Sequence, residues 1–154
     1  MHAALAAAER LDRALAVLAR PGMRTRLHHA VSTAAGTTID RAAYLVLRWL
    51  HLEGPARITD VALQMGVEPS TASRHVHLLD KRGWIAKERD AADRRVATAV
   101  VTPKGAAVVE RMEQERRRIL ATALDDWSHQ DLNRFIDSLE RLAVDLSDAL
   151  DGIE

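Results

Sequence analysis

Two neighbouring stretches of this sequence carry side chains that could bind anions. The stretch RDAADRRV, Arg89 to Val96, places five charges in eight positions and has no apolar periodicity that would bury it. The stretch PSTASRHV, which begins at Pro69, combines three short hydroxyl side chains with Arg74. Guanidinium groups pair with phosphate oxygens and base edges, and hydroxyl groups at a helix N-terminus suit phosphate. Both stretches therefore indicate recognition of a nucleic acid.

The segment from Ile58 to Gly83 has the pattern of two short helices joined by a turn. Thr59 is the expected N-cap of the first helix, and Gly66 supplies the left-handed residue that ends it. Pro69 fits the first position of the second helix, predicted over residues 69–82. Three apolar positions recur at helical spacing and should face inward: Ala72, Val76 and Leu79. The opposite face carries the candidate nucleic-acid contacts Ser70, Thr71, Ser73, Arg74, His77 and Lys81.

After Gly83 the pattern changes from helical to extended. Residues 84–89 and 96–102 are rich in Trp, Ile, Val and Thr, which predicts two strands joined by the polar tip DAADRR. Two helices followed by such a hairpin are the order of a winged helix-turn-helix, whose second helix can enter the major groove while the hairpin reaches an adjacent groove. Because Arg74 and His77 lie one turn apart on the exposed face, we expect both to contact base edges.

The segments on either side are predicted to be helical and to pair with a second copy. The chain has 154 residues, 47% hydrophobic and 3% aromatic, which favours one mostly α-helical domain. Helical runs over residues 3–19 and 23–35 are separated by Pro21-Gly22, and a third follows the possible N-caps Thr37, Thr38 and Asp40. The last helix has a narrow apolar seam that suits a partner helix. Its members are Leu132, Phe135, Leu139, Leu142, Leu146 and Ala149.

The charges are unevenly distributed although the formal net charge is zero. Residues 70–95 hold seven basic and four acidic side chains, whereas residues 119–154 hold nine acidic and two basic ones. The two regions are therefore expected to face different partners. The lack of Cys excludes disulfides and thiolate metal sites. No segment approaches about 18 uncharged apolar residues, so we expect a soluble, cytoplasmic protein with no membrane partner.

The stretch PSTASRHVHLLDKRGWIAKERDAADRRVATAVVTPKG, Pro69 to Gly105, resembles the multiple-antibiotic-resistance regulator (MarR) family of bacterial transcription factors. It follows that family's order of recognition helix, glycine, hydrophobic pair, wing with an Asp-x-Arg element, strand, and Thr-x-x-Gly at the start of a long helix. The resemblance maps Asp93 and Arg95 onto Asp-x-Arg and implies that Arg95 enters the minor groove while Asp93 braces the wing. A slender hairpin suits such a narrow, negative groove, and Arg89 and Arg94 are then expected on phosphates.

The resulting prediction is a mostly α fold with a small β-hairpin, in which a winged helix-turn-helix at residues 37–102 lies between N-terminal helices (1–36) and C-terminal helices (103–154) that form a dimerisation platform. The predicted function is a homodimeric regulator, a repressor by the resemblance, that binds a pseudo-palindromic operator in double-stranded DNA. The recognition helix, residues 69–82, would lie in the major groove and the wing, residues 89–96, in the minor groove. The Pro21-Gly22 break departs from the single long first helix of the family.

The resemblance also implies a small ligand that relieves repression. Its pocket would be lined by the second and third helical runs and the start of the long fifth helix. His28, Tyr44, Arg48 and Arg111 offer an aromatic surface and cationic groups in these segments, suited to an aromatic or phenolic anion.

Other functions compete with this prediction. One alternative is a winged helix that serves as a protein-interaction module without DNA binding, and another is a small enzyme with a histidine-bound metal. His75 and His77 lie about 200° apart around a helix and cannot share an ion alone. No nucleophile, phosphate loop or metal triad occurs as a motif, so we expect no enzyme, no cofactor and no metal. The run Arg116 to Arg118 could be a solvated face, a second phosphate contact or an intersubunit ion-pair site, and the three Trp residues are expected in the core.

Overall fold

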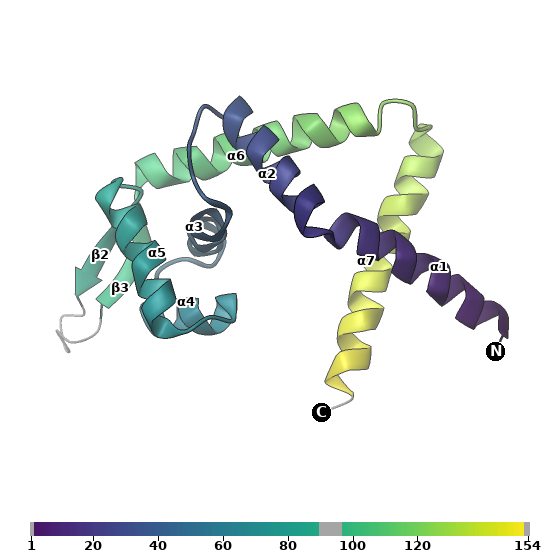
Figure 1. The fold of residues 1–154 in the computed structure, drawn as a ribbon, viewed down its shortest axis with the longest axis horizontal. Helices are drawn as coiled ribbons and strands as arrows, with labels where there is room; N and C mark the ends of the chain where they lie inside the picture. Colours follow the sequence, from purple (N-terminus) through teal and green to yellow (C-terminus); the bar gives the residue numbers. More distant parts are fainter. Residues whose placement is uncertain (1, 90–96, 153–154) are drawn as a thin grey trace. The chain divides into compact units, whose positions relative to one another are not determined.

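The computed structural model describes residues 2–89 and 97–152, with side chains for residues 5–88 and 98–152. The chain divides into two compact units, Met1–Arg116 and Arg117–Glu154. Within the described residues no helix is long and apolar enough to cross a membrane. The elements, drawn in Figure 1, are α1 (His2–Ala19), α2 (Pro21–Ala34), α3 (Arg41–Glu53), β1 (Ala56–Arg57), α4 (Ile58–Met65), α5 (Pro69–Lys81), β2 (Ile85–Arg89), β3 (Ala97–Val101), α6 (Pro103–Ala123) and α7 (His129–Asp151).

Most helix ends follow from local capping chemistry. The Asp40 carboxylate accepts a hydrogen bond from the backbone N–H of Ala43 at 2.9 Å, which fixes the start of α3. Proline occupies the first turn of α2 and of α5, where its missing N–H is not needed. Helix α2 accordingly begins at Pro21 rather than at Met23, and the predicted break between the first two helices falls at Arg20, whose backbone is extended.

The first turn of α4 differs from the prediction. Thr59 is not the N-cap, because the helix already begins at Ile58 and Arg57 takes the capping position. The carboxylate of Asp60 accepts a hydrogen bond from the Arg57 backbone N–H at 3.3 Å, which satisfies one of the free amides at the helix start. Asp60, rather than Thr59, therefore supplies the side-chain oxygen at this helix start, and it accepts from the N–H of the capping residue itself.

The core of the first unit lies between α3, α4, α5 and the sheet. Helix α3 contributes the large buried side chains Tyr44, Leu47 and Leu50. The three positions of α5 that were predicted to face inward, Ala72, Val76 and Leu79, are all buried. Burying an aliphatic side chain of this size stabilises the fold by roughly 1.5–3 kcal/mol, so this packing holds α5 firmly in place.

The predicted hairpin is present, and it belongs to a three-stranded antiparallel sheet in the order β1-β3-β2. In its register Ile85 pairs with Val101 and Arg89 pairs with Ala97. The additional strand, β1, pairs Ala56 with Ala99. Two residues are too short to show an alternating pattern, so the sequence predicted only a hairpin.

The second unit contains the end of α6 and helix α7. Ser128 caps α7 through a hydrogen bond from the Asp131 backbone N–H to its hydroxyl oxygen at 3.1 Å. Trp127 was expected in the core, but its side chain is 44% exposed, and its ring meets Phe135 edge-on at 5.4 Å between ring centroids. Trp84, in the first unit, is buried as predicted.

Candidate nucleic-acid interface

Both ends of α5 are defined by the local sequence. At the start, the backbone N–H groups of Thr71 and Ala72 donate to the Glu68 carbonyl at 2.9 and 3.1 Å. At the end, Gly83 adopts a left-handed conformation with φ 68°, and the N–H of Trp84 donates to the Leu79 carbonyl at 3.0 Å. This closing motif needs a residue that tolerates positive φ, which explains the glycine between the recognition helix and the sheet.

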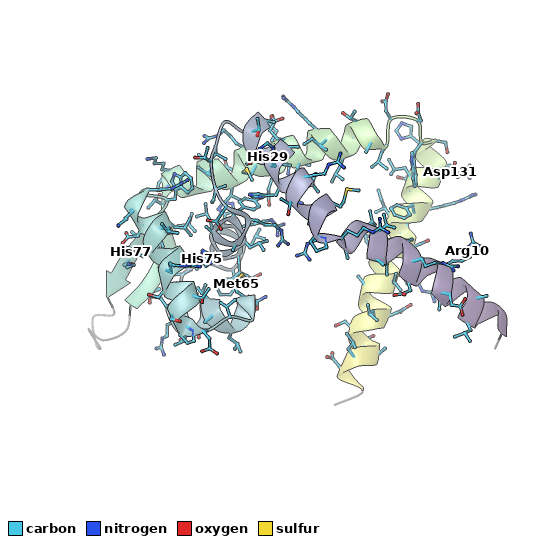
Figure 2. The ribbon with its side chains drawn as sticks, viewed as in Figure 1. Arg10, His29, Met65, His75, His77 and Asp131 are labelled. Carbon is cyan, nitrogen blue, oxygen red and sulfur yellow. The ribbon has the colours of Figure 1, made fainter. Side chains whose placement is uncertain are left out.

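The face of α5 that was predicted to contact nucleic acid points to solvent. Ser70, Ser73, Arg74, His77 and Lys81 are exposed, and Thr71 is half-buried. Figure 2 shows His77 and His75 on different sides of α5, and His75 is half-buried with a buried Nδ1 atom that has no partner in the described part of the chain. Five of the six predicted helix residues are therefore exposed together on one strip of α5, while Thr71 and His75 are half-buried at its side.

The C-terminal end of α5 is held against the sheet and the start of α6. The Thr102 hydroxyl donates to the Gly83 carbonyl at 2.7 Å, and the Lys104 Nζ donates to the Arg82 carbonyl at 3.1 Å. A Cβ atom at Gly105 would lie 1.9 Å from the Trp84 carbonyl oxygen, so only glycine fits there. The Thr-x-x-Gly sequence is thus a close contact between α6 and the turn that follows the recognition helix.

Ion pairs and ring contacts add to this junction. Lys87 of β2 pairs with Asp80 of α5 at 3.3 Å between Nζ and Oδ2. The Arg82 guanidinium lies 4.8 Å from the centroid of the Trp84 ring and donates to the Thr38 carbonyl. Arg82, which follows α5 directly, is therefore bound to the protein itself, whereas Arg74 and Lys81 present their charges to solvent.

The predicted wing contacts fall where the structure gives no side chains. Strand β2 ends at Arg89 and β3 begins at Ala97, so the tip of the hairpin lies between them. Asp93, Arg94 and Arg95 lie outside the described residues, as does the side chain of Arg89. Their roles stay predictions from the sequence.

Comparison with known proteins shows the family of this fold. A profile of the MarR family matches residues 39–97. The HTH-type transcriptional regulator YxaD of Bacillus subtilis is 31% identical over 104 residues, which cover 68% of this chain and 73% of YxaD. The chain belongs to the MarR family. Solved structures extend the likeness beyond residues 39–97.

A MarR family protein from Bacillus stearothermophilus superimposes with a TM-score of 0.77 at 23% identity, covering 96% of this chain and 98% of that one. A MepR-like protein, solved in complex with pseudoligands, superimposes with a TM-score of 0.57 at 26% identity, covering 86% and 92%. This MarR-family chain is therefore a transcriptional regulator with a winged-helix fold, not an enzyme, and its family implies DNA binding.

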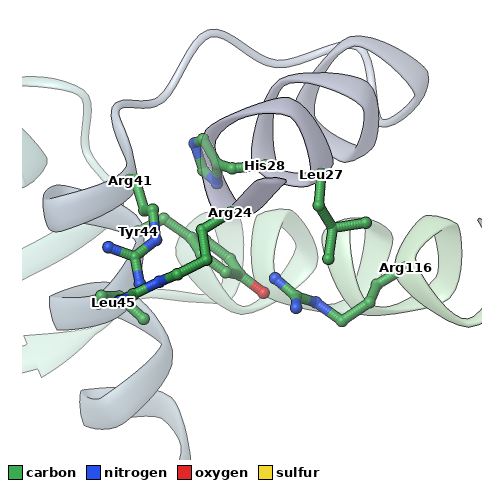
Figure 3. A pocket seen from close by; sticks show the side chains of 7 residues that line it. All are labelled: Arg24, Leu27, His28, Arg41, Tyr44, Leu45 and Arg116. Atoms are coloured by element: carbon green, nitrogen blue, oxygen red, sulfur yellow. The ribbon is translucent and has the colours of Figure 1, made fainter. Parts of the chain in front are cut away.

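A separate pocket lies between α2, α3 and α6 of this MarR-family protein (Figure 3). It has a volume of about 180 Å³ and brings together two of the four predicted ligand residues, His28 and Tyr44, whose ring centroids are 5.8 Å apart. The other two lie elsewhere. Arg48 pairs with Glu113 at 3.0 Å, and Arg111 lines an open groove with Lys81 and Lys104.

Three arginines line the pocket that the sequence did not assign to a ligand: Arg24, Arg41 and Arg116. The sequence places Arg116 in a basic run with three possible roles, and Arg24 and Arg41 lie in two other helical segments. They come from α2, α3 and α6, so no spacing within one helix could have grouped them. Only the packing of these three helices brings them together.

Two polar groups in the pocket are buried without a hydrogen-bond partner among the described residues. Tyr44 is 1% exposed, and its hydroxyl has no hydrogen-bond partner among the described residues. Leaving such a donor unsatisfied costs about 1–3 kcal/mol. The His28 Nε2 atom donates to the Ile39 carbonyl at 2.8 Å, so its buried Nδ1, which lacks a partner in the same part of the chain, is an acceptor in the neutral ring.

The electrostatics of the pocket follow from burial and from its like charges. Burial raises the pKa of the Tyr44 hydroxyl, an effect that Arg116 opposes and Glu113 reinforces. The pKa of Arg41 is lowered, first by burial and then by the positive charges of Arg24 and Arg116. The lining of this pocket is therefore positive, and the buried Tyr44 hydroxyl adds a hydrogen-bond donor.

Proposed function

We propose that this MarR-family regulator is a homodimeric repressor that binds a pseudo-palindromic operator, with α5 in the major groove and the wing in the minor groove. The observation that carries the proposal is the exposed strip of α5, where hydroxyl, imidazole and cationic groups lie opposite a fully buried apolar face. A helix fixed in this way can enter a groove without rearranging, because its own packing does not depend on the DNA.

The charges of the strip suit the chemistry of DNA. Arg74 and Lys81 can neutralise phosphates or meet guanine edges, and the hydroxyl of Ser70, near the positive end of the helix dipole, can bind phosphate. Because each neutralised phosphate releases counterions, operator affinity should fall steeply between low and moderate salt. A protein-interaction module would not require this dependence.

Homodimerisation is supported by apolar faces that the single chain leaves exposed. Leu11 and Leu15 of α1 and Phe135, Leu139 and Leu146 of α7 are all exposed. A palindromic operator places two equivalent major-groove sites about 34 Å apart, so two α5 helices held by a paired platform would match it. Ligand control would then act through the separation of the two helices.

The direct test measures binding of the purified protein to the DNA upstream of its own gene by fluorescence anisotropy. Arg74→Ala should weaken binding by about 1–3 kcal/mol, which is roughly 5- to 150-fold, without unfolding the protein. Arg141→Ala is the matched control, because it removes the same charge from an exposed position on α7. Equal affinities for operator and shuffled DNA, or an Arg74→Ala variant with unchanged affinity, would favour the protein-interaction module.

The wing has its own test. Arg95→Ala should also cost about 1–3 kcal/mol of operator affinity, since it removes a guanidinium from the narrow minor groove. Unchanged binding by this variant would remove the wing from the mechanism while leaving the role of α5 intact.

We further propose that a small ligand in the pocket between α2, α3 and α6 relieves repression. The support is the convergence of His28 and Tyr44 on one pocket, and the pseudoligands bound by the MepR-like protein of similar fold. A ligand changes DNA affinity only by its differential affinity for the two states, typically about 1–3 kcal/mol. Release of labelled operator by a saturating ligand, with no change in the secondary structure, is the expected result.

A further inference from the structure

The pocket between α2, α3 and α6 carries more positive charge than a single carboxylate would balance. Its lining comprises Arg24, Leu27, His28, Arg41, Tyr44, Leu45 and Arg116, with no carboxylate among them. Within the described part of the chain, none of the three guanidinium groups donates a hydrogen bond or joins an ion pair. Three like charges converge here without a counterion from these residues, an arrangement that an anionic ligand would stabilise.

The pocket has a second feature that points to a ligand. Tyr44 is almost fully buried, its hydroxyl has no partner among the described residues, and Figure 3 shows this oxygen directed toward Arg116. A carboxylate or phosphate oxygen held by Arg116 would accept that hydroxyl proton. The buried donor and the guanidinium thus specify the same kind of atom, an anionic oxygen.

Size restricts the ligand further. A volume of about 180 Å³ lies below the roughly 300–1,000 Å³ of sites for drug-sized compounds. The apolar part of the lining consists mainly of Leu27, Leu45 and the ring of Tyr44. A compound of a few carbon atoms with charged ends, or one small ring, would fill this space.

We propose that this pocket selects a small dianion, a dicarboxylate or a phosphate monoester, whose charged oxygens are shared among Arg24, Arg41, Arg116 and the Tyr44 hydroxyl. The inference rests on the ligand response proposed above and narrows its chemistry. A monoanion such as a phenolic acid would leave two of the three guanidinium groups unbalanced. Two anionic groups, each able to form paired hydrogen bonds with a guanidinium, satisfy the arrangement better.

Matched pairs of probes test the role of the second charge. Isothermal titration calorimetry of the full chain, without DNA, compares phthalate with benzoate and succinate with butyrate, because the members of each pair share a carbon framework and differ by one carboxylate. Phenyl phosphate provides the phosphate arm. Each dianion should bind at least about tenfold more tightly than its partner, and the stronger of phthalate and phenyl phosphate identifies the preferred anionic group. Equal affinities within both pairs, or no binding of any probe, would overturn the proposal.

Variants assign the binding to these residues. Arg116→Gln should lower the affinity for the preferred dianion at least about tenfold, and Arg111→Gln should leave it unchanged, because Arg111 is exposed on the same helix but lines another groove. Tyr44→Phe should weaken binding several-fold while circular dichroism shows an intact fold. Unchanged binding by Arg116→Gln would place the dianion elsewhere and overturn the proposal.

Measuring operator binding and dianion binding with the same purified protein distinguishes the dianion site from the proposed regulatory function. Operator binding that persists in the wild type while phthalate and benzoate bind alike would overturn the dianion site alone. Selective dianion binding by a protein with no affinity for operator DNA would support the site and contradict the regulatory function.

Discussion

Helices α5 and α7 have the same kind of sequence pattern and opposite surroundings. Both place apolar residues at intervals of three and four, and both present charged residues on the other face. In α5 the apolar positions are buried against the core of the first unit, whereas in α7 no residue is buried. Amphipathic spacing therefore predicts that an apolar face will be covered, but it does not show whether the same chain or a second copy covers it.

The difference has a physical origin in helix length and neighbours. Helix α5 has 13 residues and packs against α3, α4 and β2, which lie close to it in sequence. Helix α7 has 23 residues, an axis of about 34 Å, and shares its unit only with the end of α6. Its exposed seam would cost much less free energy in contact with the same seam of a second copy.

The largest expected effect comes from a charge in the uncovered seam. Leu139→Asp places a carboxylate where the dimer would bury a leucine, so sedimentation should show monomers. Operator affinity should then fall toward the non-specific level, about a thousandfold or more, because one half-site is lost. Asn133→Asp adds the same charge to an exposed position of α7 outside the seam and should leave the dimer intact. A monomeric wild type would show that no second copy covers the seam of α7.

Substitutions in the buried face of α5 should lower the stability of the fold rather than disrupt the dimer. Leu79 is 1% exposed and Leu78, the adjacent residue, is 43% exposed. Leu79→Ala should lower the free energy of unfolding by about 2–5 kcal/mol, since it leaves a cavity in the core. Leu78→Ala should cost clearly less in urea titrations of the two variants. Similar losses for both would mean that the outer face of α5 is also packed.

Alanine substitutions at two glycines should have opposite effects, because Gly105 lies in the tight contact between α6 and Trp84 whereas Gly22 lies at an open helix start. Gly105→Ala forces a Cβ against the Trp84 carbonyl and should destabilise the protein by about 1–3 kcal/mol. Gly22→Ala meets no atom within 4 Å in the first turn of α2 and should stabilise by about 0.4–1 kcal/mol. Thermal unfolding should therefore shift in opposite directions for the two substitutions, and shifts of the same sign would contradict this account.

The sequence predicted the features that depend on neighbouring residues and missed those that depend on contacts between distant segments. The bounds of α5, its buried positions and its glycine ending depend on residues within a few positions of one another, so local patterns predicted them. Strand β1 exists only because Ala56 meets Ala99, and the arginines of the pocket come from three helices. Such long-range contacts leave no local period. Trp127 was expected in the core because of its residue type, yet its side chain is 44% exposed in the second unit.

The smallest expected effect concerns Tyr44, whose buried hydroxyl has no hydrogen-bond partner among the described residues. Tyr44 is the only tyrosine of the chain, so phenolate absorbance reports it alone. Burial raises its pKa above the ordinary value of 10.0. The folded state therefore keeps the proton longer than the unfolded state does. The stability from this group is fully present below about pH 10 and is lost as the pH rises through the folded pKa.

Tyr44→Phe isolates that contribution. The variant removes a buried hydroxyl without a partner among the described residues, so its free energy of unfolding at neutral pH should match or exceed that of the wild type by up to about 1 kcal/mol. Its stability should also fall less between pH 10 and 12 than that of the wild type, by roughly the linkage free energy of one proton. A phenolate midpoint at or below 10.0 in the native protein would show that the ring is not in the buried environment that distinguishes this unit from the exposed α7.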